Sequence, residues 1–518
     1  MPPSIVSDTH DLGRIQRQTS EGRADHPDAP SRAPIALEQA HEAPRCSRRA
    51  CRRSIDFDML CNAHGGCKAA RRGMSMVRLN DQLLGRFRID ARIAEGGMAT
   101  VYRGFDQQLD QTIAIKVLRH GAIADVARFE REAEILAALD HPGISRYITG
   151  GVAHDGSRFL VLEWIDGTTL AEHHARAGLT PADGVAVVAQ VAGALGTAHA
   201  RGLVHRDIKP DNILLAGGEL SRAKLIDFGL GRTAGDVRLT ETGTAVGTPG
   251  YMAPEQARGE RAIDPRGDVF ALGCVLYECV SGVPAFAGRN SAAVMARIVL
   301  CDPPAIGAVW PAVPPALERL LSRMLAKRRD DRPRDAAEVA AELAAIAAPD
   351  SPRRRRSSVE AAPTVVGHGD AAHAIFLHAG PVDPAAPGGP ADADAVAALV
   401  RVVAPFRAVV HPLADGTIVV VVPGDEAAAA ADCALALAGS FAEAPIVLVG
   451  PGQLAAPLGA VIDAGAEALE RADLQRIFGG AASAGAIRVD PVTARRLAGR
   501  FELHHDGAGT WRLIGRSP

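Results

Sequence analysis

Aromatic side chains account for only 4% of the 518 residues, so small aliphatic side chains must fill the cores of this protein. No run of about 18 uninterrupted apolar residues occurs, which argues against a membrane-spanning helix. The 57 basic and 60 acidic residues leave a formal charge of −3, which argues against a general nucleic-acid binder. The length of the chain predicts two or three domains.

Cysteine is scarce, and the first residues lack the apolar segment of a secretion signal. We therefore expect a cytoplasmic protein with free thiols and no disulfide framework. Residues 1–80 are polar and predict a disordered N-terminal extension, although translation from Met74 or Met76 is an alternative. Cysteine spacings in this region lack the C-x2-C pairs of most zinc modules, but a metal site is left open at Cys46, Cys51, Cys61, Cys67 and His64.

The order of the patterns predicts an α+β body with two lobes over 87–347. Helical spacing at 126–139 places four apolar side chains on one side, namely Phe129, Ala133, Leu136 and Leu139. From 168 onward helices dominate, with a loop-rich stretch at 202–255. Strand patterns come before this point, at 87–95, 99–106, 112–118, 144–152 and 158–165.

A second apolar-patterned body follows over 372–516, after a linker at 348–371. The linker contains four consecutive arginines beside Ser357 and Ser358, which is typical of an exposed segment. A phosphorylation site or a patch for an acidic partner is the alternative there. In the second body a helix pattern at 427–439 accompanies strand patterns at 374–379, 417–424 and 445–450.

Several polar side chains occur in a combination that suits phosphoryl transfer. Gly96 and Gly97, between two strand patterns, allow backbone N–H groups to approach phosphates closely. Lys116 lies on a strand pattern, where a cation is costly unless paired, and Glu132 on the following helix is a candidate partner. Asp227 is a hard oxygen ligand that suits Mg2+. The loop 205–212 adds a carboxylate, a cation and an amide oxygen, from Asp207, Lys209 and Asn212.

These motifs resemble, in order and spacing, a bacterial eukaryote-like serine/threonine protein kinase domain over 87–345. The matching segments are I-A-E-G-G-M-A-T-V at 93–101, I-A-I-K at 113–116, R-E-A at 131–133, H-R-D-I-K-P-D-N at 205–212, D-F-G at 227–229 and A-P-E at 253–255. The resemblance implies a bilobal protein kinase-like fold. Its N-lobe is β-rich with one regulatory helix, and its C-lobe is mainly α.

The resemblance also implies a reaction, in which the γ-phosphoryl group of ATP passes to Ser or Thr hydroxyls of protein substrates. Asp207 would accept the hydroxyl proton, and Lys209 would stabilise the transferred group. Lys116 would hold the α/β-phosphates and pair with Glu132. Asn212 and Asp227 would bind Mg2+, with Mn2+ as an alternative. Nucleotide contacts are implied for Ile93, Ala94, Glu95, Gly96, Gly97, Met98, Ala99, Val101, Ala114, Lys116, Glu163, Ile165, Asn212 and Asp227.

Further positions follow from the same resemblance. Leu162 would stand at the gate of the hinge, and Asp268 would brace the catalytic loop. Glu255 and Arg332 match a buried structural ion pair. Alanines replace glycines of the family pattern at 94 and 99, which restricts the backbone and could lower nucleotide affinity. Gly96 is retained and Gly97 is a candidate compensation, so we expect the change to be tolerated.

Regulation is implied by Arg206, since an arginine at this place of the motif commonly pairs with a phosphate on the activation loop. The phosphorylation candidates are Thr240, Thr242 and Thr244, for which simple loop threonines are the alternative. Self-association of two copies is one route to autophosphorylation. Lys209 and Thr248 match kinases that act on serine and threonine rather than tyrosine.

Residues 372–516 resemble a class III nucleotide cyclase homology domain, which implies a smaller α/β domain. The segments are A-I-F-L-H at 374–378, A-D-G-T-I-V-V-V-V at 414–422, L-G-A-V-I-D-A-G-A-E at 458–467 and 485–503. His378 stands in place of one metal aspartate, and Asp415 keeps the other. Asp463 and Glu467 replace the asparagine and arginine that a cyclase needs, and two carboxylates would repel a triphosphate. We therefore expect a degenerate regulatory domain that binds a partner, a ligand or another copy of itself.

Two other readings remain open. A pseudokinase scaffold would bind partners without catalysis, but Lys116, Asp207 and Asp227 are all retained, which favours an active kinase. An active cyclase fused to a kinase is disfavoured by His378 and by the two acidic residues at 463 and 467. The sequence identifies neither the protein substrate nor the input signal.

Overall fold

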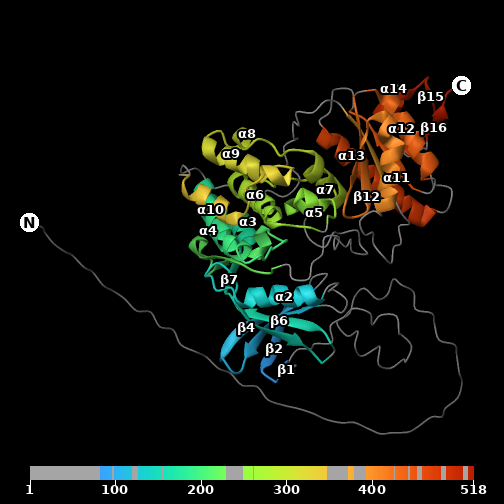
Figure 1. Ribbon diagram of the computed structural model, residues 1–518. Coiled ribbons are helices and arrows are strands. Elements are labelled where there is room, and N and C mark those ends of the chain that lie inside the picture. The colour runs from blue at the N-terminus through green and yellow to red at the C-terminus, as the bar shows by residue number, and fades with distance from the viewer. Residues whose placement is uncertain are drawn as a thin grey trace, which may run out of the picture. The chain divides into compact units, whose positions relative to one another are not determined.

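A computed structural model of the protein describes most of residues 82–518 (Figure 1). The described ranges are 82–83, 85–95, 99–118, 126–154, 156–228, 249–260, 262–346, 372–378, 393–424, 426–441, 444–451, 458–479, 486–505 and 511–518. The predictions made for 1–80, for 96–98, for the threonines at 240, 242, 244 and 248, and for the linker at 348–371 lie outside these residues.

The first lobe is an antiparallel sheet in the order β1-β2-β3-β4-β6-β5, with helix α2 lying against it (Figure 1). Every strand predicted from the alternation of apolar residues occurs, and β1 adds a short edge strand. The elements are β1 (Gln82–Leu83), β2 (Phe87–Glu95), β3 (Ala99–Asp106), β4 (Gln111–Leu118), α2 (Val126–Ala137), β5 (Tyr147–Val152) and β6 (Arg158–Glu163).

Strand β4 shows how this sheet orients its polar residues. Ile113, Ile115 and Val117 alternate along β4 and are fully buried on one face, because successive side chains of a strand point to opposite sides. Ala114 and Lys116 therefore share the other face. In the neighbouring strands Lys116 is opposite Val101 of β3 and Leu160 of β6. This second face is the one that carries the predicted site residues.

The second lobe is helical and is built around α6, which is buried along almost its whole length. Asp264 caps the start of α6 by accepting a hydrogen bond from the Arg266 N–H at 2.9 Å, and Gly282 ends it at a φ of 81°. The elements are β7 (Gly167–Thr169), α3 (Leu170–Ala177), α4 (Pro181–His199), β8 (Ile213–Ala216), β9 (Ala223–Leu225), α5 (Pro254–Ala257), α6 (Pro265–Ser281), α7 (Ser291–Leu300), α8 (Ile306–Val309), α9 (Pro315–Met324) and α10 (Ala336–Ala344).

The C-terminal domain is a seven-stranded sheet in the order β11-β12-β10-β13-β14-β16-β15. Its first four strands form a βαββαβ unit with α11 and α12, and the strand and helix patterns predicted at 374–379, 417–424, 445–450 and 427–439 are all present. The elements are β10 (Ala372–His378), α11 (Ala393–Val403), β11 (Val409–Pro412), β12 (Thr417–Pro423), α12 (Ala427–Ser440), β13 (Ile446–Val449), α13 (Leu458–Gly479), β14 (Ile487–Val489), α14 (Pro491–Leu497), β15 (Phe501–His505) and β16 (Trp511–Arg516).

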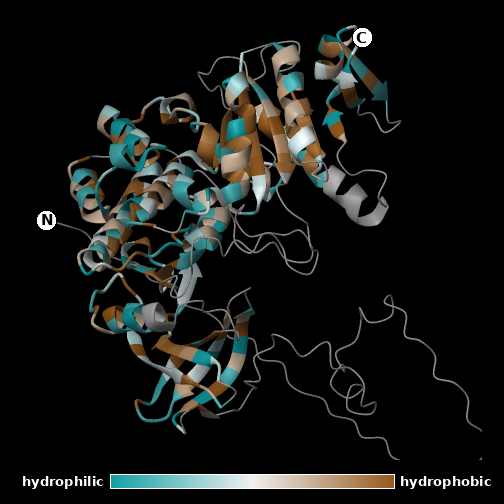
Figure 2. Ribbon diagram, turned by 45° about the vertical axis from the view of Figure 1, so that its right-hand side comes forward, coloured by the Kyte–Doolittle hydropathy of each residue, from teal (hydrophilic) through white to brown (hydrophobic). Residues whose placement is uncertain are grey.

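The central strands of this sheet, β12, β10 and β13, are apolar on both faces, and brown strands are plain in this domain in Figure 2. Ile375, Leu377 and Val420 pack with residues of α11 and α12 on one face. Phe376 and Val419 belong to the other face, where α13 lies close enough that Gly465 of α13 has no room for a side chain beside Phe376. A sheet buried on both sides explains the continuous valine run of β12.

None of the helices in the described ranges has the length and apolar character needed to span a bilayer. The four described cysteines, Cys274, Cys279, Cys301 and Cys433, are buried free thiols. Burial raises the pKa of the Cys301 thiol to about 11, so it remains protonated at neutral pH.

Two glycines of α4 offer a matched test of the packing between α4 and α10. A methyl group at Gly196 would lie 2.9 Å from both the Ala337 backbone nitrogen and Cβ, whereas at Gly193 it would meet nothing within 4 Å. We expect Gly196→Ala to lower the free energy of unfolding by about 1–3 kcal/mol through overpacking. Gly193→Ala should raise it by up to about 1 kcal/mol through helix propensity. Urea denaturation of both variants checks this, and equal effects would contradict the close approach.

Candidate active site

Two predicted side chains of the 205–212 loop contact the carboxylate of the third, Asp207. Asp207 Oδ2 accepts a hydrogen bond from Asn212 Nδ2 at 2.9 Å and lies 3.2 Å from Lys209 Nζ. The Asn212 amide also donates to the Asp207 backbone carbonyl at 2.7 Å. The orientation of Asp207 is therefore set by a cation and an amide from the same loop.

The β8–β9 hairpin brings Asp227 to this loop although it lies fifteen residues after Asn212. In the hairpin Ile213 pairs with Leu225, and the Ile226 N–H donates to the Asn212 carbonyl at 3.0 Å. Asn212 and Asp227 consequently flank the same end of two paired strands. Because the Asn212 amide nitrogen is directed at Asp207, its oxygen is the atom left to bind a cation. Two hard oxygen donors fit a magnesium ion.

The backbone of the site is strained at two positions, and Asp268 holds one of them in place. Arg206 and Asp227 have φ values of 63° and 60°, in the left-handed region that disfavours residues with a Cβ. The buried Asp268 carboxylate accepts hydrogen bonds from the His205 and Arg206 N–H groups, both at 2.7 Å. Asp268 thus braces the catalytic loop as the family resemblance implies.

His199, which no sequence signal identified, completes this brace. The Ala336 N–H donates to His199 Nδ1 at 3.2 Å, so the proton is on Nε2, which lies 3.0 Å from Asp268 Oδ2. Burial acts to raise the pKa of Asp268, but the hydrogen bond from His199 and the charges of neighbouring groups outweigh it, and the pKa is lowered. Asp268 therefore remains an ionised acceptor for both amides.

His205, the first residue of the loop, acts as a neutral packing element. Burial lowers its pKa, its ring lies 4.6 Å from that of Phe228, and its Nε2 lies 3.0 Å from the Ile226 carbonyl oxygen. The Asp207 N–H donates to the other ring nitrogen at 3.3 Å. The imidazole thus links the catalytic loop to the segment that carries Asp227.

The structure places Lys116 beside Asp227, and the predicted pairing of Lys116 with Glu132 stays a prediction. Lys116 Nζ lies 3.2 Å from Asp227 Oδ1, and Glu132 Oε1 accepts a hydrogen bond from Arg206 Nη1 at 2.8 Å. All four side chains are largely withdrawn from solvent, so each needs an opposite charge, and two cations with two carboxylates allow two sets of pairs. The ion pair with Glu132 thus occupies Arg206, the residue predicted to pair with a phosphate group on the activation loop.

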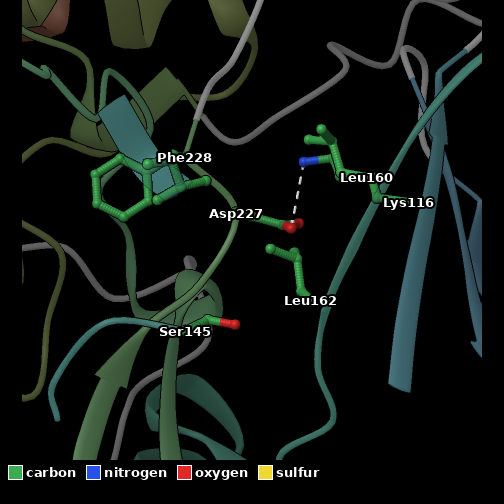
Figure 3. A pocket seen from close by; sticks show the side chains of 7 residues that line it. Lys116, Ser145, Leu160, Leu162, Asp227 and Phe228 are labelled. Carbon is green, nitrogen blue, oxygen red and sulfur yellow. Dashed lines mark ion pairs between the residues drawn. The ribbon is translucent and has the colours of Figure 1, made fainter. Parts of the chain in front are cut away.

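A pocket lies beside the Lys116–Asp227 ion pair (Figure 3). Leu162, the predicted gate residue, lines it at the position opposite Ala114 in the sheet. Four lining residues were not assigned to the site from the sequence, namely Leu136 of α2, Ser145 of the loop before β5, Leu160 of β6 and Phe228 after β9. The first three have only the sequence pattern of buried or loop residues, whereas Phe228 belongs to the D-F-G motif.

The remaining predicted nucleotide contacts lie at the ends of strands. Ile93, Ala94 and Glu95 are exposed at the end of β2, across from Val101 and Thr100 of β3. Ala99 begins β3 and is buried. Glu163 ends β6, and its side chain accepts hydrogen bonds from Lys224 Nζ at 2.6 Å and from the Arg146 N–H at 3.0 Å. These contacts orient the Glu163 side chain, and Ile165 follows two residues later.

A buried ion pair joins α5 to the end of the helical lobe. Arg332 donates to both Glu255 oxygens, at 2.8 and 2.9 Å, and its remaining N–H groups donate to backbone carbonyls. Gln256, the next residue, donates from Nε2 to the Arg206 carbonyl at 2.9 Å. The predicted Glu255–Arg332 pair is present, and through Gln256 it supports the catalytic loop.

A strand lobe and a helical lobe that converge on this loop define the protein kinase fold, and residues 87–343 match the family model of the protein kinase domain. The chain is 37% identical over 229 residues to the serine/threonine-protein kinase pkn3 of Myxococcus xanthus, which covers 42% of each chain. It is 39% identical over 234 residues to PknL of Mycobacterium tuberculosis, covering 44% of this chain and 57% of PknL. It is 37% identical over 227 residues to PknB of the same organism, covering 42% and 36%.

Residues 87–343 are therefore a serine/threonine protein kinase domain of the bacterial type. The matched region spans less than two thirds of each of these relatives.

Removing the acceptor that braces the loop tests this geometry. Asp268→Asn places an amide N–H against one of two backbone N–H donors in a buried site, so we expect the free energy of unfolding to fall by about 2–4 kcal/mol. Asp330→Asn, which removes an exposed partner of Arg266, is the matched control and should cost less than about 1 kcal/mol. Denaturant unfolding measures both, and equal losses would show that Asp268 is no brace.

Proposed function

We propose that the whole protein is an active kinase that transfers the γ-phosphoryl group of ATP to Ser or Thr hydroxyls of protein substrates. The observation that carries this proposal is the Asp207 carboxylate, which Lys209 and Asn212 orient beside the hairpin that presents Asp227. A carboxylate, a cation and two oxygen donors for a metal are the groups that this reaction needs.

Each of the four polar residues at the catalytic loop has a proposed role that suits its chemistry. Bound Mg2+–ATP would supply the phosphoryl group and the charge neutralisation of its oxygens, and Mn2+ is an alternative metal. Asp207 accepts the proton of the attacking hydroxyl. Lys209 lies next to that carboxylate and stabilises the negative charge on the transferred group. Asn212 and Asp227 would hold the metal through their side-chain oxygens.

The strand lobe supplies the nucleotide contacts. Lys116 would hold the α/β-phosphates of ATP in place of its ion pair with Asp227, and Glu132 would then be the carboxylate partner of Lys116. Val101 and Ala114 share the sheet face of Lys116 and would pack on the adenine, while backbone groups of Glu163 and Ile165 would bond to its edge. Contacts of residues 93–99 with the phosphates are what the family resemblance implies.

Selectivity and regulation extend the proposal to the activation segment. Lys209 and Thr248 favour serine and threonine over tyrosine. A phosphate on Thr240, Thr242 or Thr244 would attract Arg206 away from Glu132 and so free that carboxylate for Lys116. Two copies of the protein meet for this autophosphorylation.

For the C-terminal domain we propose a degenerate nucleotide cyclase-like fold with a regulatory role. This proposal is supported by the βαββαβ unit of the domain, whose strands have the order β13-β10-β12-β11 in the sheet. His378 on β10 lies opposite Thr417 on β12. Asp415 precedes Thr417 by two residues, and its carboxylate accepts a hydrogen bond from the Thr417 N–H at 2.9 Å. With acidic residues at 463 and 467, we propose that the domain produces no cyclic nucleotide.

The role of Asp207 is tested by a single isosteric change. We expect Asp207→Asn to lower kcat by about 10²- to 10⁴-fold, since the general base is lost. Binding of a fluorescent ATP analogue should persist, because the nucleotide contacts lie elsewhere. Asp211→Asn, an exposed carboxylate of the same loop, is the matched control and should retain kcat. A radiolabelled-ATP assay with a protein substrate checks both, and a fully active Asp207→Asn enzyme would refute the assignment.

Autophosphorylation is tested by mass spectrometry after incubation with Mg2+–ATP. We expect phosphate on the 233–248 peptide at Thr240, Thr242 or Thr244, and none on the Asp207→Asn protein, because the transfer depends on that carboxylate. An unmodified peptide recovered from a wild-type enzyme that phosphorylates other proteins would be the contrary result.

A further inference from the structure

The acidic residues that depart from the cyclase pattern contact the kinase domain. Asp463 Oδ2 on α13 accepts a hydrogen bond from Arg297 Nη2 on α7, and Glu467 accepts from Arg289 Nη1 at 2.7 Å. Glu470 accepts from Asn290 Nδ2 at 2.9 Å. Residues 463, 467 and 470 lie on one face of the helix, since their spacing is four and three. This acidic face of α13 therefore contacts two arginines and one asparagine at the start of α7 and along it.

The Arg297–Asp463 ion pair is the centre of the contact. The Arg297 side chain is 9% exposed and that of Asp463 is 24% exposed, whereas Arg289 is 70% exposed at the rim. Arg297 also donates to the Gly459 carbonyl at 3.2 Å, and a methyl group at Gly459 would already touch the guanidinium at 3.4 Å. Either charge left alone in this position would be costly, so the two side chains stabilise each other only when the domains are together.

Apolar burial surrounds the charged centre. Val461, Ile462 and Ala466 of α13 belong to the same continuous buried cluster as the core of the helical lobe. Leu413 and Ala414, in the turn between β11 and β12, are fully buried as well. The Ala414 N–H donates to the Ala257 carbonyl of α5 at 2.8 Å. The interface therefore has a buried interior and a polar rim, as stable protein interfaces do.

The surface covered by the C-terminal domain adjoins the catalytic loop. Ala257 follows Gln256, whose side chain donates to the Arg206 carbonyl at 2.9 Å, one residue before Asp207. His411, near the same turn, is half-buried, and its partial burial together with the charge of Arg258 lowers its pKa to about 4. A domain held here lies beside the loop that a protein substrate must reach, while ATP is held by the strand lobe.

We propose that α13 docks the C-terminal domain in cis on the α5–α7 surface through the Arg297–Asp463 ion pair, and that the docked domain limits access of protein substrates to the catalytic loop. The substitutions that remove cyclase residues are, on this account, the residues that create the docking face. The part of the proposal that concerns substrate access rests on the proposed kinase activity.

Docking itself is tested by hydrogen exchange on the full-length protein, which needs no catalysis. We expect Arg297→Glu to speed exchange about tenfold or more in 291–300, in 458–470 and at the Ala414 amide. The double variant Arg297→Glu/Asp463→Arg restores an ion pair and should return exchange to the wild-type rate. Arg334→Glu, at an exposed pair within the helical lobe, is the control and should change none of these segments.

A conservative variant covers the case in which Arg297→Glu fails to fold. Asn290 caps α7 by accepting from the Ala293 N–H at 2.9 Å, and Asn290→Asp keeps this cap. Its new carboxylate faces Glu470 and the Ala466 carbonyl, so exchange in 458–470 should rise while α7 remains capped. Unchanged exchange at 458–470 and Ala414 in folded Asn290→Asp protein, or no recovery in the double variant, would overturn the docking.

Substrate access is tested with myelin basic protein as the phosphate acceptor. We expect Arg297→Glu or Asn290→Asp to raise kcat/KM for this protein about fivefold, with KM for ATP unchanged. Faster exchange without any rise in kcat/KM would overturn the access part of the proposal. An inactive wild-type enzyme would instead contradict the proposed kinase function, and the exchange data would still decide whether the domain docks.

Discussion

The Asp268 carboxylate is the contact on which the geometry of the catalytic loop depends. It accepts two backbone N–H groups of the loop and the ring proton of His199, and His199 is itself held by the first turn of α10. One buried carboxylate thus connects α6, α4, α10 and the residue that precedes Asp207. A left-handed φ at Arg206 persists because Asp268 accepts a hydrogen bond from its N–H and Gln256 donates one to its carbonyl oxygen. The charges and metal donors of the site are positioned relative to that fixed loop.

The charges of the site are arranged as exchangeable pairs. Lys116 with Asp227, and Glu132 with Arg206, satisfy four partly buried groups without a nucleotide or a phosphate. Each group is also suited to a second partner, since Lys116 can meet phosphates and Arg206 can meet a phosphothreonine. A site of this kind can bind phosphates by replacing one pair with another, and part of the desolvation of its side chains precedes that exchange. The proposed nucleotide binding and activation-loop phosphorylation would both involve the carboxylates of Asp227 and Glu132.

The C-terminal domain contacts the kinase domain through charged side chains of one helix. Asp463 and Glu467 lie on one helix, α13, and accept hydrogen bonds from Arg297 and Arg289 of the kinase domain. One face of the domain's sheet is covered by α11 and α12, while the other is covered by α13 and is continuous with the helical lobe. The charge of one face of α13 therefore matches the arginines that it meets.

The amino-acid sequence alone determined the strands and helices of both bodies, because apolar residues recur with the period of two or 3.6 that each element requires. It also identified Asp207, Lys209, Asn212 and Asp227, since these belong to short motifs whose chemistry is readable locally. Only the tertiary structure decided which cation meets which carboxylate: Glu132 and Arg206 are 74 residues apart, and Arg297 and Asp463 are 166 apart. It also placed His199 against Asp268. No local pattern encodes such pairs, because they depend on distances that exist only after the elements have packed.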